Sequence, residues 1–284
     1  MNPPVKIAAV QLCTGTAVAD NNRQIERAVR EAAAAGARLV CLPEAANLLL
    51  PEVTAYPAAC VPEAQDTTLA MCRSLASELG LWLHTGSLLV RTEEGDRIWN
   101  RSHLITPSGT IAARYDKLHT FDVKLGGAGD FRESTSVKPG TGAPVVVHIA
   151  PLGITLGMSI CYDVRFGYLH RALAKAGADV LLVPASFSVI TGPLHWDVLL
   201  RARAIETGSY VIAAAQCGER AGLKVYGHSR VISPFGELLA EAQEAPTILY
   251  ADLDPDQSRQ TRARLPCLEQ ERALLPADVI TVTD

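Results

Sequence analysis

The chain has 284 residues, of which 48% are hydrophobic and 20% charged, so a sizeable core is expected and a disordered chain is excluded. The formal net charge is −4 and the basic residues are scattered, which argues against a nucleic-acid partner. No apolar run approaches the length of a membrane span, and no basic leader precedes an apolar segment at the N-terminus. We therefore expect a cytoplasmic protein with no membrane partner.

The seven cysteines are an odd number, lie far apart and lack the paired spacing of a zinc ribbon. No metal site is expected from them. A free cysteine in an apolar run usually packs as a small hydrophobic residue. Inert packing is therefore the expectation for all of them except Cys161, namely for Cys13, Cys41, Cys60, Cys72, Cys217 and Cys267.

The first half of the chain predicts alternating strands and helices. An apolar run over Val5–Leu12 indicates a strand, and helically spaced apolar residues over Asn22–Gly36 indicate an amphipathic helix that stops at a glycine. The segment Leu39–Leu42 is fully apolar and ends at Pro43, which is typical of a strand buried on both faces. Further predictions are a helix over residues 67–79 and strands over Leu81–Val90 and Ile98–Thr106.

The second half of the chain repeats this order. The segment Ala35–Pro43 matches Ala176–Pro184 position for position in residue type, and Pro107–Ala113 resembles Pro234–Ala240. Such echoes predict two similar α/β halves. The corresponding elements are strands over Pro144–Ile149, Gly153–Ile160 and Val180–Val183, and a helix over Tyr168–Ala176.

No linker rich in proline, glycine or serine divides the halves near residues 125–150, so we expect a single domain over residues 1–268 and a tail over residues 269–284. Two sheets packed face to face with helices outside would bury both sets of apolar strands. The predicted fold is therefore a four-layer α-β-β-α sandwich. The glycine-rich stretch Gly126–Gly142 is expected to be an irregular loop over the strand ends.

Cys161 is a candidate nucleophile because it follows an apolar strand and precedes a helix. A turn of this kind can present a side chain beside backbone N–H groups. A thiol with its ordinary pKa is mostly protonated at neutral pH and needs a base or a nearby cation to react. Position alone leaves the alternative of an inert, buried cysteine open.

Glu44 and Lys117 are candidates for that base and that cation. Glu44 stands where the strand Leu39–Leu42 ends, a place where α/β sheets gather functional groups, and its echo in the repeat is Ala185. Lys117 lies in a polar stretch after a short strand. Taken singly, a solvated loop carboxylate and a surface lysine are the alternatives.

Four segments occur in the order in which the nitrilase superfamily of carbon–nitrogen hydrolases carries them. They are Leu42-Pro-Glu44, Tyr115–His119, Arg132-Glu133-Ser134 and Ile160–Phe166. The chain resembles that superfamily from Val5 to about Leu268, and the resemblance implies the same four-layer sandwich.

Within the superfamily, Thr191–Thr207 resembles the amidases of deaminated glutathione and the neighbouring ω-amidases, and Ala213–Gly218 and Tyr226–Ser229 favour the former. The chain departs from these amidases at Gly167-Tyr168, where they carry Pro-Glu, and at Glu269–Arg272, where they are often more basic. The first departure affects the expected substrate and the second the expected subunit packing.

The resemblance implies a mechanism without metal or organic cofactor. Glu44 takes the proton of Cys161, whose sulfur attacks the amide carbon. Lys117, helped by the backbone N–H of Tyr162, stabilises the oxyanion and lowers the pKa of the thiol. Glu133 orients Lys117 or the substrate. Ammonia leaves, and water hydrolyses the thioester that remains.

Residues near the nucleophile are candidates for substrate binding. Arg165 either pairs with a substrate carboxylate or fixes Asp163 or another carboxylate. Phe187 and Thr191 are expected in the pocket wall. His195 begins a helix, where packing is the alternative role. Tyr162 completes the set of expected substrate-binding residues.

The expected substrate is a small carboxylate-bearing amide, with deaminated glutathione first. An ω-amidase acting on α-ketoglutaramate, an N-carbamoyl amino acid hydrolase and a non-catalytic scaffold of the same fold are the alternatives. The resemblance also implies a homodimer or higher homo-oligomer, with the C-terminal tail packed on a partner subunit.

Overall fold

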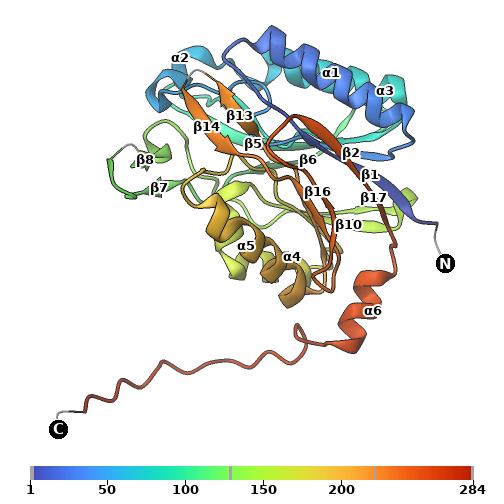
Figure 1. Ribbon diagram of the computed structural model, residues 1–284, viewed down its shortest axis with the longest axis vertical. Helices are drawn as coiled ribbons and strands as arrows, with labels where there is room; N and C mark the ends of the chain where they lie inside the picture. The colour runs from blue at the N-terminus through green and yellow to red at the C-terminus, as the bar shows by residue number, and fades with distance from the viewer. Residues whose placement is uncertain (1–2, 128–129, 221, 283–284) are drawn as a thin grey trace.

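The computed structural model describes residues 3–127, 130–220 and 222–282 and forms two sheets packed face to face, with helices on both outer faces (Figure 1). This arrangement confirms the predicted four-layer α-β-β-α sandwich. In spatial order, the first sheet contains β17 (Thr247–Leu253), β1 (Val5–Gln11), β2 (Leu39–Cys41), β3 (Trp82–His84), β5 (Ile98–Ile105) and β4 (Leu88–Arg91), with β6 (Ile111–Asp116) paired to β5.

The second sheet repeats the topology of the first. In each sheet three parallel strands are flanked by antiparallel ones, so β1, β2, β3 and β5 correspond to β10, β11, β12 and β15. This confirms the two similar halves. In spatial order, the second sheet contains β16 (Leu238–Glu241), β15 (Arg230–Ile232), β12 (Tyr210–Ala213), β11 (Val180–Leu182), β10 (Ile154–Met158) and β9 (Val146–Ile149).

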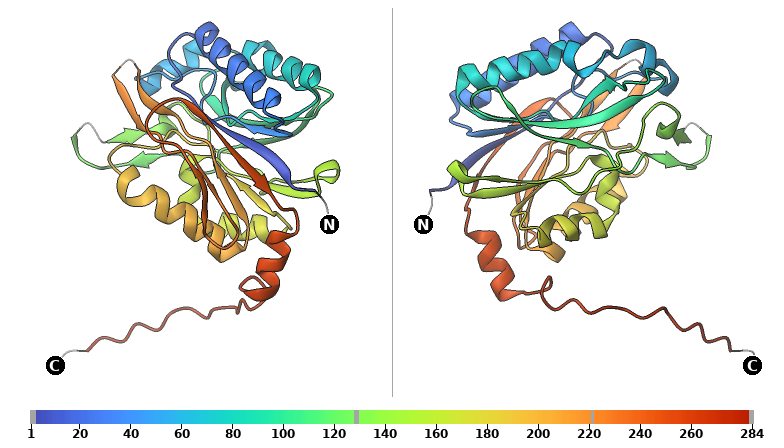
Figure 2. Two further views of the ribbon diagram at one scale, coloured as in Figure 1. Left: turned by 45° about the vertical axis from the view of Figure 1, so that its right-hand side comes forward. Right: turned by 180° about the vertical axis from the view of Figure 1, so that it is seen from behind.

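Helices cover the outer face of each sheet, as the two views in Figure 2 show. Helices α1 (Val18–Ala34) and α3 (Thr67–Leu79) pack on the first sheet, and α4 (Gly167–Lys175) and α5 (Gly192–Thr207) on the second. Among the described residues, the other α-helices are α2 (Tyr56–Ala59) and α6 (Gln257–Arg264). The other strands form two small hairpins, β7 (Asp122–Val123) with β8 (Phe131–Arg132) and β13 (Cys217–Arg220) with β14 (Leu223–Tyr226).

The core consists of three apolar layers because successive residues of each strand face opposite sides. In β1, Ala8 and Val10 pack with α1 and α3, whereas Ile7 and Ala9 pack between the sheets. Strands of this kind are buried on both faces, which explains why they are almost wholly apolar. The two sheets are also joined covalently, because β16 in the second sheet leads directly to β17 in the first.

Four sequence expectations need correction. The helix predicted from Asn22 begins at Val18. The strand predicted over Leu81–Val90 is broken between β3 and β4, since Gly86 adopts a positive φ of 64° and lies against the backbone carbonyl of Pro43, where a Cβ would clash. The stretch Gly126–Gly142 contains β8 and the 3-10 turn Glu133–Thr135. Cys267 is exposed, not packed.

The C-terminal tail has no helix or strand over residues 271–282 and exposes its apolar side chains, among them Leu274 and Ile280. The division into a domain over residues 1–268 and a tail that packs on a partner subunit stays a prediction. Across the described ranges, no helix is both long enough and apolar enough to cross a membrane.

Candidate active site

Three predicted catalytic side chains meet at one edge of the sandwich. Glu44 follows β2, Lys117 follows β6 and Cys161 follows β10, and all three are more than nine-tenths buried. The carboxyl ends of parallel strands form the edge at which α/β proteins place functional groups. The surface alternatives for Glu44 and Lys117 are therefore wrong.

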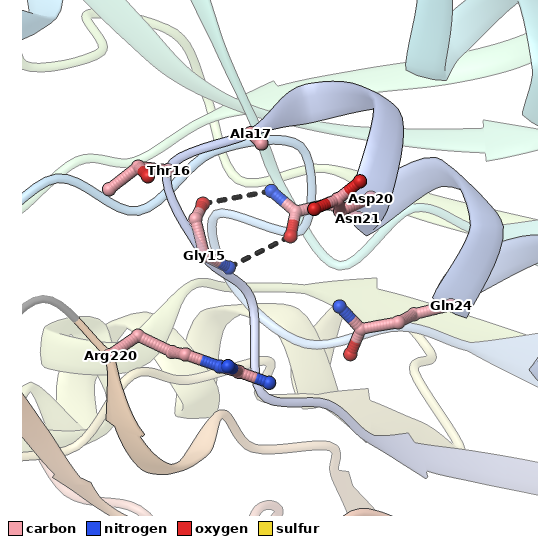
Figure 3. A pocket seen from close by; sticks show the side chains of 7 residues that line it. All are labelled: Gly15, Thr16, Ala17, Asp20, Asn21, Gln24 and Arg220. Atoms are coloured by element: carbon pink, nitrogen blue, oxygen red, sulfur yellow. Dashed lines mark hydrogen bonds between the residues drawn. The ribbon is translucent and has the colours of Figure 1, made fainter.

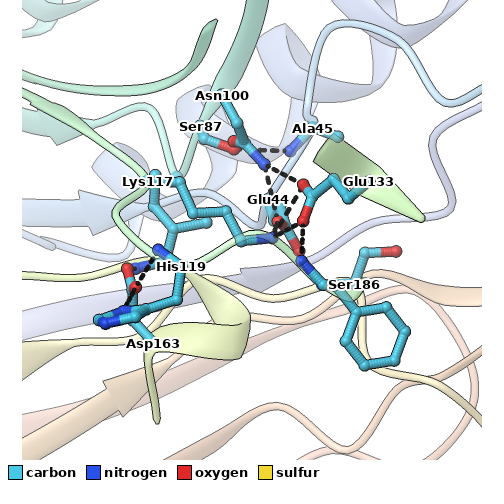
Figure 4. Close-up of polar contacts among 12 residues, drawn as sticks. Glu44, Ala45, Ser87, Asn100, Lys117, His119, Glu133, Asp163 and Ser186 are labelled. Carbon is cyan, nitrogen blue, oxygen red and sulfur yellow. Dashed lines mark hydrogen bonds and ion pairs between the residues drawn. The ribbon is translucent and has the colours of Figure 1, made fainter. Parts of the chain in front are cut away.

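Lys117 lies between two carboxylates (Figure 4). Its Nζ donates to Glu44 Oε1 at 2.9 Å and to Glu133 Oε2 at 2.9 Å. Burial alone would lower the pKa of this lysine, but the charges of Glu133 and Glu44 outweigh burial and raise the pKa well above its ordinary value. Lys117 is therefore a fixed ammonium ion at neutral pH.

Glu44 is held in one orientation by donors from both sheets. Besides Lys117, Asn100 Nδ2 donates to Oε1 at 2.9 Å, and the backbone N–H of Ser186 donates to Oε2 at 2.7 Å. Ser186 directly follows Ala185, the echo of Glu44 in the second half. The second half of the fold thus supplies a backbone N–H donor next to the position that corresponds to the carboxylate of the first half.

Glu133 is a buried member of the site and not a solvated charge. Its Oε2 accepts the backbone N–H of Phe121 at 2.6 Å, and both its oxygens contact Lys117 Nζ. The 3-10 turn Glu133–Thr135 places it beneath the loop that follows Lys117. This geometry supports a role in orienting the lysine.

Cys161 occupies a strained turn after β10. It opens the 3-10 turn Cys161–Arg165 with a φ of 46°, in the left-handed region that non-glycine residues rarely adopt. Its backbone N–H donates to the carbonyl of Pro184 at 2.8 Å. Strain of this kind persists only where surrounding contacts enforce it.

The pKa of the Cys161 thiol is raised, not lowered. Burial raises it well above the ordinary value, Glu44 adds to the effect, and Lys117 opposes both without reversing them. The expected lowering of the thiol pKa by Lys117 is present, but burial and Glu44 outweigh it. The resting sulfur is protonated and must lose its proton as it attacks.

A cavity of about 550 Å³ ends at these residues. Glu44, Lys117 and Cys161 line its buried end, whereas Ile190 and Lys224 line its exposed mouth. A smaller cavity of about 20 Å³ shares Cys161 with it. Four of the five predicted substrate-binding residues line this smaller cavity, namely Tyr162, Arg165, Phe187 and Thr191.

Arg165 contacts other predicted substrate-binding residues. Its Nη1 lies 3.0 Å from His195 Nδ1 and its Nη2 lies 3.4 Å from Thr191 Oγ1. Its guanidinium also lies over the rings of Tyr162 and Phe187. It does not fix Asp163, whose carboxylate binds Tyr115 and His119, so that structural alternative is wrong. Pairing with a substrate carboxylate stays a prediction.

Asn100 and Ser186 belong to the site but were missed from the sequence. Asn100 stands inside β5, and asparagine is depleted in strands, so its presence there was the available signal. Ser186 acts through its backbone N–H, and a backbone donor leaves no mark in the residue type.

A second cavity of about 230 Å³ lies at the start of α1 (Figure 3). Asn21 in its wall accepts the N–H of Gly15 and donates to the carbonyl of Gly15, and Arg220 reaches it from β13. Among the residues that the structure describes, its lining contains no cysteine and no paired lysine and carboxylate. In the described part of the chain, no group of three or more His, Cys, Asp or Glu side chains is arranged to hold a metal ion.

This fold and this site define a class of enzyme. The sequence model of the carbon–nitrogen hydrolase family matches residues 6–263, so the chain belongs to the carbon–nitrogen hydrolases. It is 39% identical to human deaminated glutathione amidase, covering 94% of this chain and 83% of that protein. It is 32% identical to zebrafish omega-amidase NIT2, with 94% of each chain covered.

A solved structure shows the same likeness. A mutant of the amidase from Nesterenkonia sp. AN1, with acrylamide added at its active-site cysteine, has a TM-score of 0.76 and 28% identity to this chain. The match covers 92% of this chain and 98% of that one. The chain is accordingly an amidohydrolase that acts on linear amides.

Proposed function

We propose that the chain hydrolyses a small carboxylate-bearing amide through a thioester on Cys161, and that deaminated glutathione is this amide. The observation that carries the mechanism is the position of Lys117, fixed between Glu44 and Glu133 at the buried end of a cavity that also contains Cys161. The human relative named for deaminated glutathione supports the substrate.

The first half of the reaction follows from the protonation states. Glu44 accepts the thiol proton while sulfur bonds to the amide carbon, and the carbonyl oxygen becomes an oxyanion. Lys117 has three N–H donors, and all three bond to its glutamates, one to Glu44 and two to the oxygens of Glu133. Glu133 needs only one of them, so the other can turn to the oxyanion and stabilise it. Glu44 then protonates the leaving nitrogen, the carbon–nitrogen bond breaks, and the amine departs.

The second half regenerates the enzyme. Glu44 removes a proton from water, the resulting hydroxide attacks the thioester carbon, and the carbon–sulfur bond breaks. The proton returns to the sulfur and the acid leaves. The balance is one amide and one water giving one carboxylic acid and one amine, without oxidant or metal.

The leaving group depends on the substrate. The expectation that ammonia leaves does not hold for deaminated glutathione, which has no primary amide. Cleavage of the amide bond between its keto acid and cysteine releases the amine cysteinylglycine. An ω-amide such as α-ketoglutaramate releases ammonia instead. Ammonia release is thus diagnostic of the ω-amidase alternative, which the zebrafish relative supports.

The volume of the cavity and a cation at its mouth support a substrate longer than a simple ω-amide. A volume of about 550 Å³ falls within the range of ligand sites for drug-sized molecules. Lys224, on β14, lines the mouth and forms no ion pair in the described part of the chain. A second carboxylate at the far end of the substrate would find a cation there.

Side-by-side turnover assays test this proposal. We expect purified enzyme to release cysteinylglycine from deaminated glutathione faster than it releases ammonia from α-ketoglutaramate. Cys161→Ala serves as the blank. Faster ammonia release would favour the ω-amidase alternative, carbon dioxide from N-carbamoyl amino acids would favour a carbamoyl hydrolase, and silence on all three would refute the substrate class.

A further inference from the structure

A completely buried carboxylate connects the segment of Lys117 to the segment of Cys161. Asp163 is 0% exposed and lies two residues after Cys161, in the same 3-10 turn. In Figure 4 it points toward His119, beside the backbone that carries Lys117. It does not line the cavity, so its role in the reaction would be indirect.

Asp163 accepts hydrogen bonds from both catalytic segments. Tyr115 Oη donates to Oδ2 at 2.7 Å, and the backbone N–H of His119 donates to Oδ1 at 3.1 Å. These two residues flank Lys117 at two positions on either side. The backbone N–H of Ile160, which precedes Cys161, donates to Oδ2 at 2.9 Å.

The ring of His119 strengthens this connection. Its Nδ1 lies 2.6 Å from Asp163 Oδ1, and because a carboxylate can only accept, Nδ1 is the donor. The ring stacks on Phe166 with centroids 3.6 Å apart, and its Nε2 contacts the hydroxyl of Tyr168. The Gly167-Tyr168 departure noted in the sequence therefore places a tyrosine on the outer side of His119.

We propose that Asp163, together with Tyr115 and His119, is a positioning group that sets the place of the Lys117 ammonium relative to the Cys161 sulfur; this inference rests on the proposed cysteine mechanism. Lys117 bonds to glutamates from other segments, and Cys161 sits in a turn that its own φ disfavours. Asp163 bonds directly to both segments. Loss of one donor would let the two groups shift apart, and a shift of about 1 Å can cost about a hundredfold in rate.

Matched variants of the donors test the inference while leaving Asp163 in place. Tyr115→Phe and His119→Ala each remove one side-chain donor, whereas His119→Asn keeps an N–H close to the position of Nδ1. Tyr210→Phe, the control, removes a buried hydroxyl that bonds to Gln257 on α6 and does not contact the positioning group. The readouts are kcat and KM, the rate at which iodoacetamide labels the Cys161 peptide, and the unfolding temperature.

We expect Tyr115→Phe and His119→Ala to lower kcat by about 10-fold to 100-fold with KM nearly unchanged, and to slow Cys161 labelling in parallel. His119→Asn should recover most of both rates, and Tyr210→Phe should match the wild type. Variants that fold normally and keep wild-type kcat and labelling would overturn the inference. The inference would also be overturned if His119→Ala and His119→Asn lost kcat and labelling rate equally and a lowered unfolding temperature accounted for both losses. A wild-type enzyme whose Cys161 is not labelled would instead refute the proposed function.

Discussion

The buried end and the mouth of the main cavity differ in how their side chains are held. At the buried end, Lys117, Glu44 and Glu133 bind one another and backbone N–H groups from both halves of the fold. At the mouth, Ile190 and Lys224 are exposed. The buried end is therefore held in place by the sandwich itself, whereas the mouth is formed by exposed side chains.

The largest expected effect concerns the nucleophile at the buried end. Cys161→Ala should lower kcat at least about a thousandfold, because the described residues of the cavity lining include no second cysteine that could form the thioester. Cys267→Ala, which changes an exposed cysteine far along the chain, is the matched control and should keep full activity. Amide turnover by both variants measures the difference, and activity retained in Cys161→Ala would contradict the mechanism.

The next effect concerns the cation. Lys117→Met should lower kcat by about 100-fold to 1000-fold and the free energy of unfolding by about 3–5 kcal/mol, because two carboxylates would stay buried without their counter-ion. Denaturant unfolding and turnover measure the two losses. The double variant Lys117→Met/Glu133→Gln should regain part of the stability but none of the rate; if stability does not return, the carboxylates were not the cause.

A third prediction follows from the raised pKa of Cys161. The pKa of this thiol is higher in the folded state than in the unfolded state, where it is about 8.5. Such a group contributes its full stability below the unfolded-state pKa and loses that contribution as the pH rises toward the folded-state pKa. Wild-type stability should therefore fall above about pH 8.5, and Cys161 should contribute at most about 1.4 kcal/mol per pH unit to that slope.

Unfolding free energies at pH 8, 9 and 10 check this prediction. Cys161→Ala should decline less steeply than the wild type, whereas Cys267→Ala should decline as steeply. Identical slopes in all three proteins would show that the thiol does not titrate with a raised pKa.

The smallest effect concerns the mouth. Lys224→Ala should raise KM for deaminated glutathione about threefold, because an exposed ion pair is worth at most about 1 kcal/mol, and should leave α-ketoglutaramate turnover unchanged. Arg220→Ala removes an equal charge from β13, the other strand of the same hairpin, but Arg220 lines the cavity at α1. This variant should change neither the KM for deaminated glutathione nor the turnover of α-ketoglutaramate. A KM rise of equal size in both variants would indicate a general charge effect.

Much of the fold could be predicted because its signals are local. Strands such as β1 and β2 are continuous apolar runs, and α1 and α3 have helical spacing and end near glycines. The break between β3 and β4 could not be predicted. Position 86 needs a glycine because a Cβ there would clash with the carbonyl of Pro43, which lies far away in the sequence.

The candidate active site likewise has features that the sequence predicts and features that it does not. The types and order of Glu44, Lys117, Glu133 and Cys161 stand in the sequence and carry the family resemblance. The contacts of Asn100 and the buried role of Asp163 depend on which segments the fold brings together. The direction in which the pKa of the Cys161 thiol shifts depends on the balance between burial and Lys117, and no sequence pattern shows that balance.

The central claim is a thioester on Cys161, and rapid quenching of the enzyme with deaminated glutathione tests it most directly. Peptide mapping by mass spectrometry should place the keto-acyl group on Cys161, with cysteinylglycine released in the same burst and no adduct in Cys161→Ala. Cysteinylglycine release without an acyl group on Cys161, or equal release by Cys161→Ala, would contradict the account.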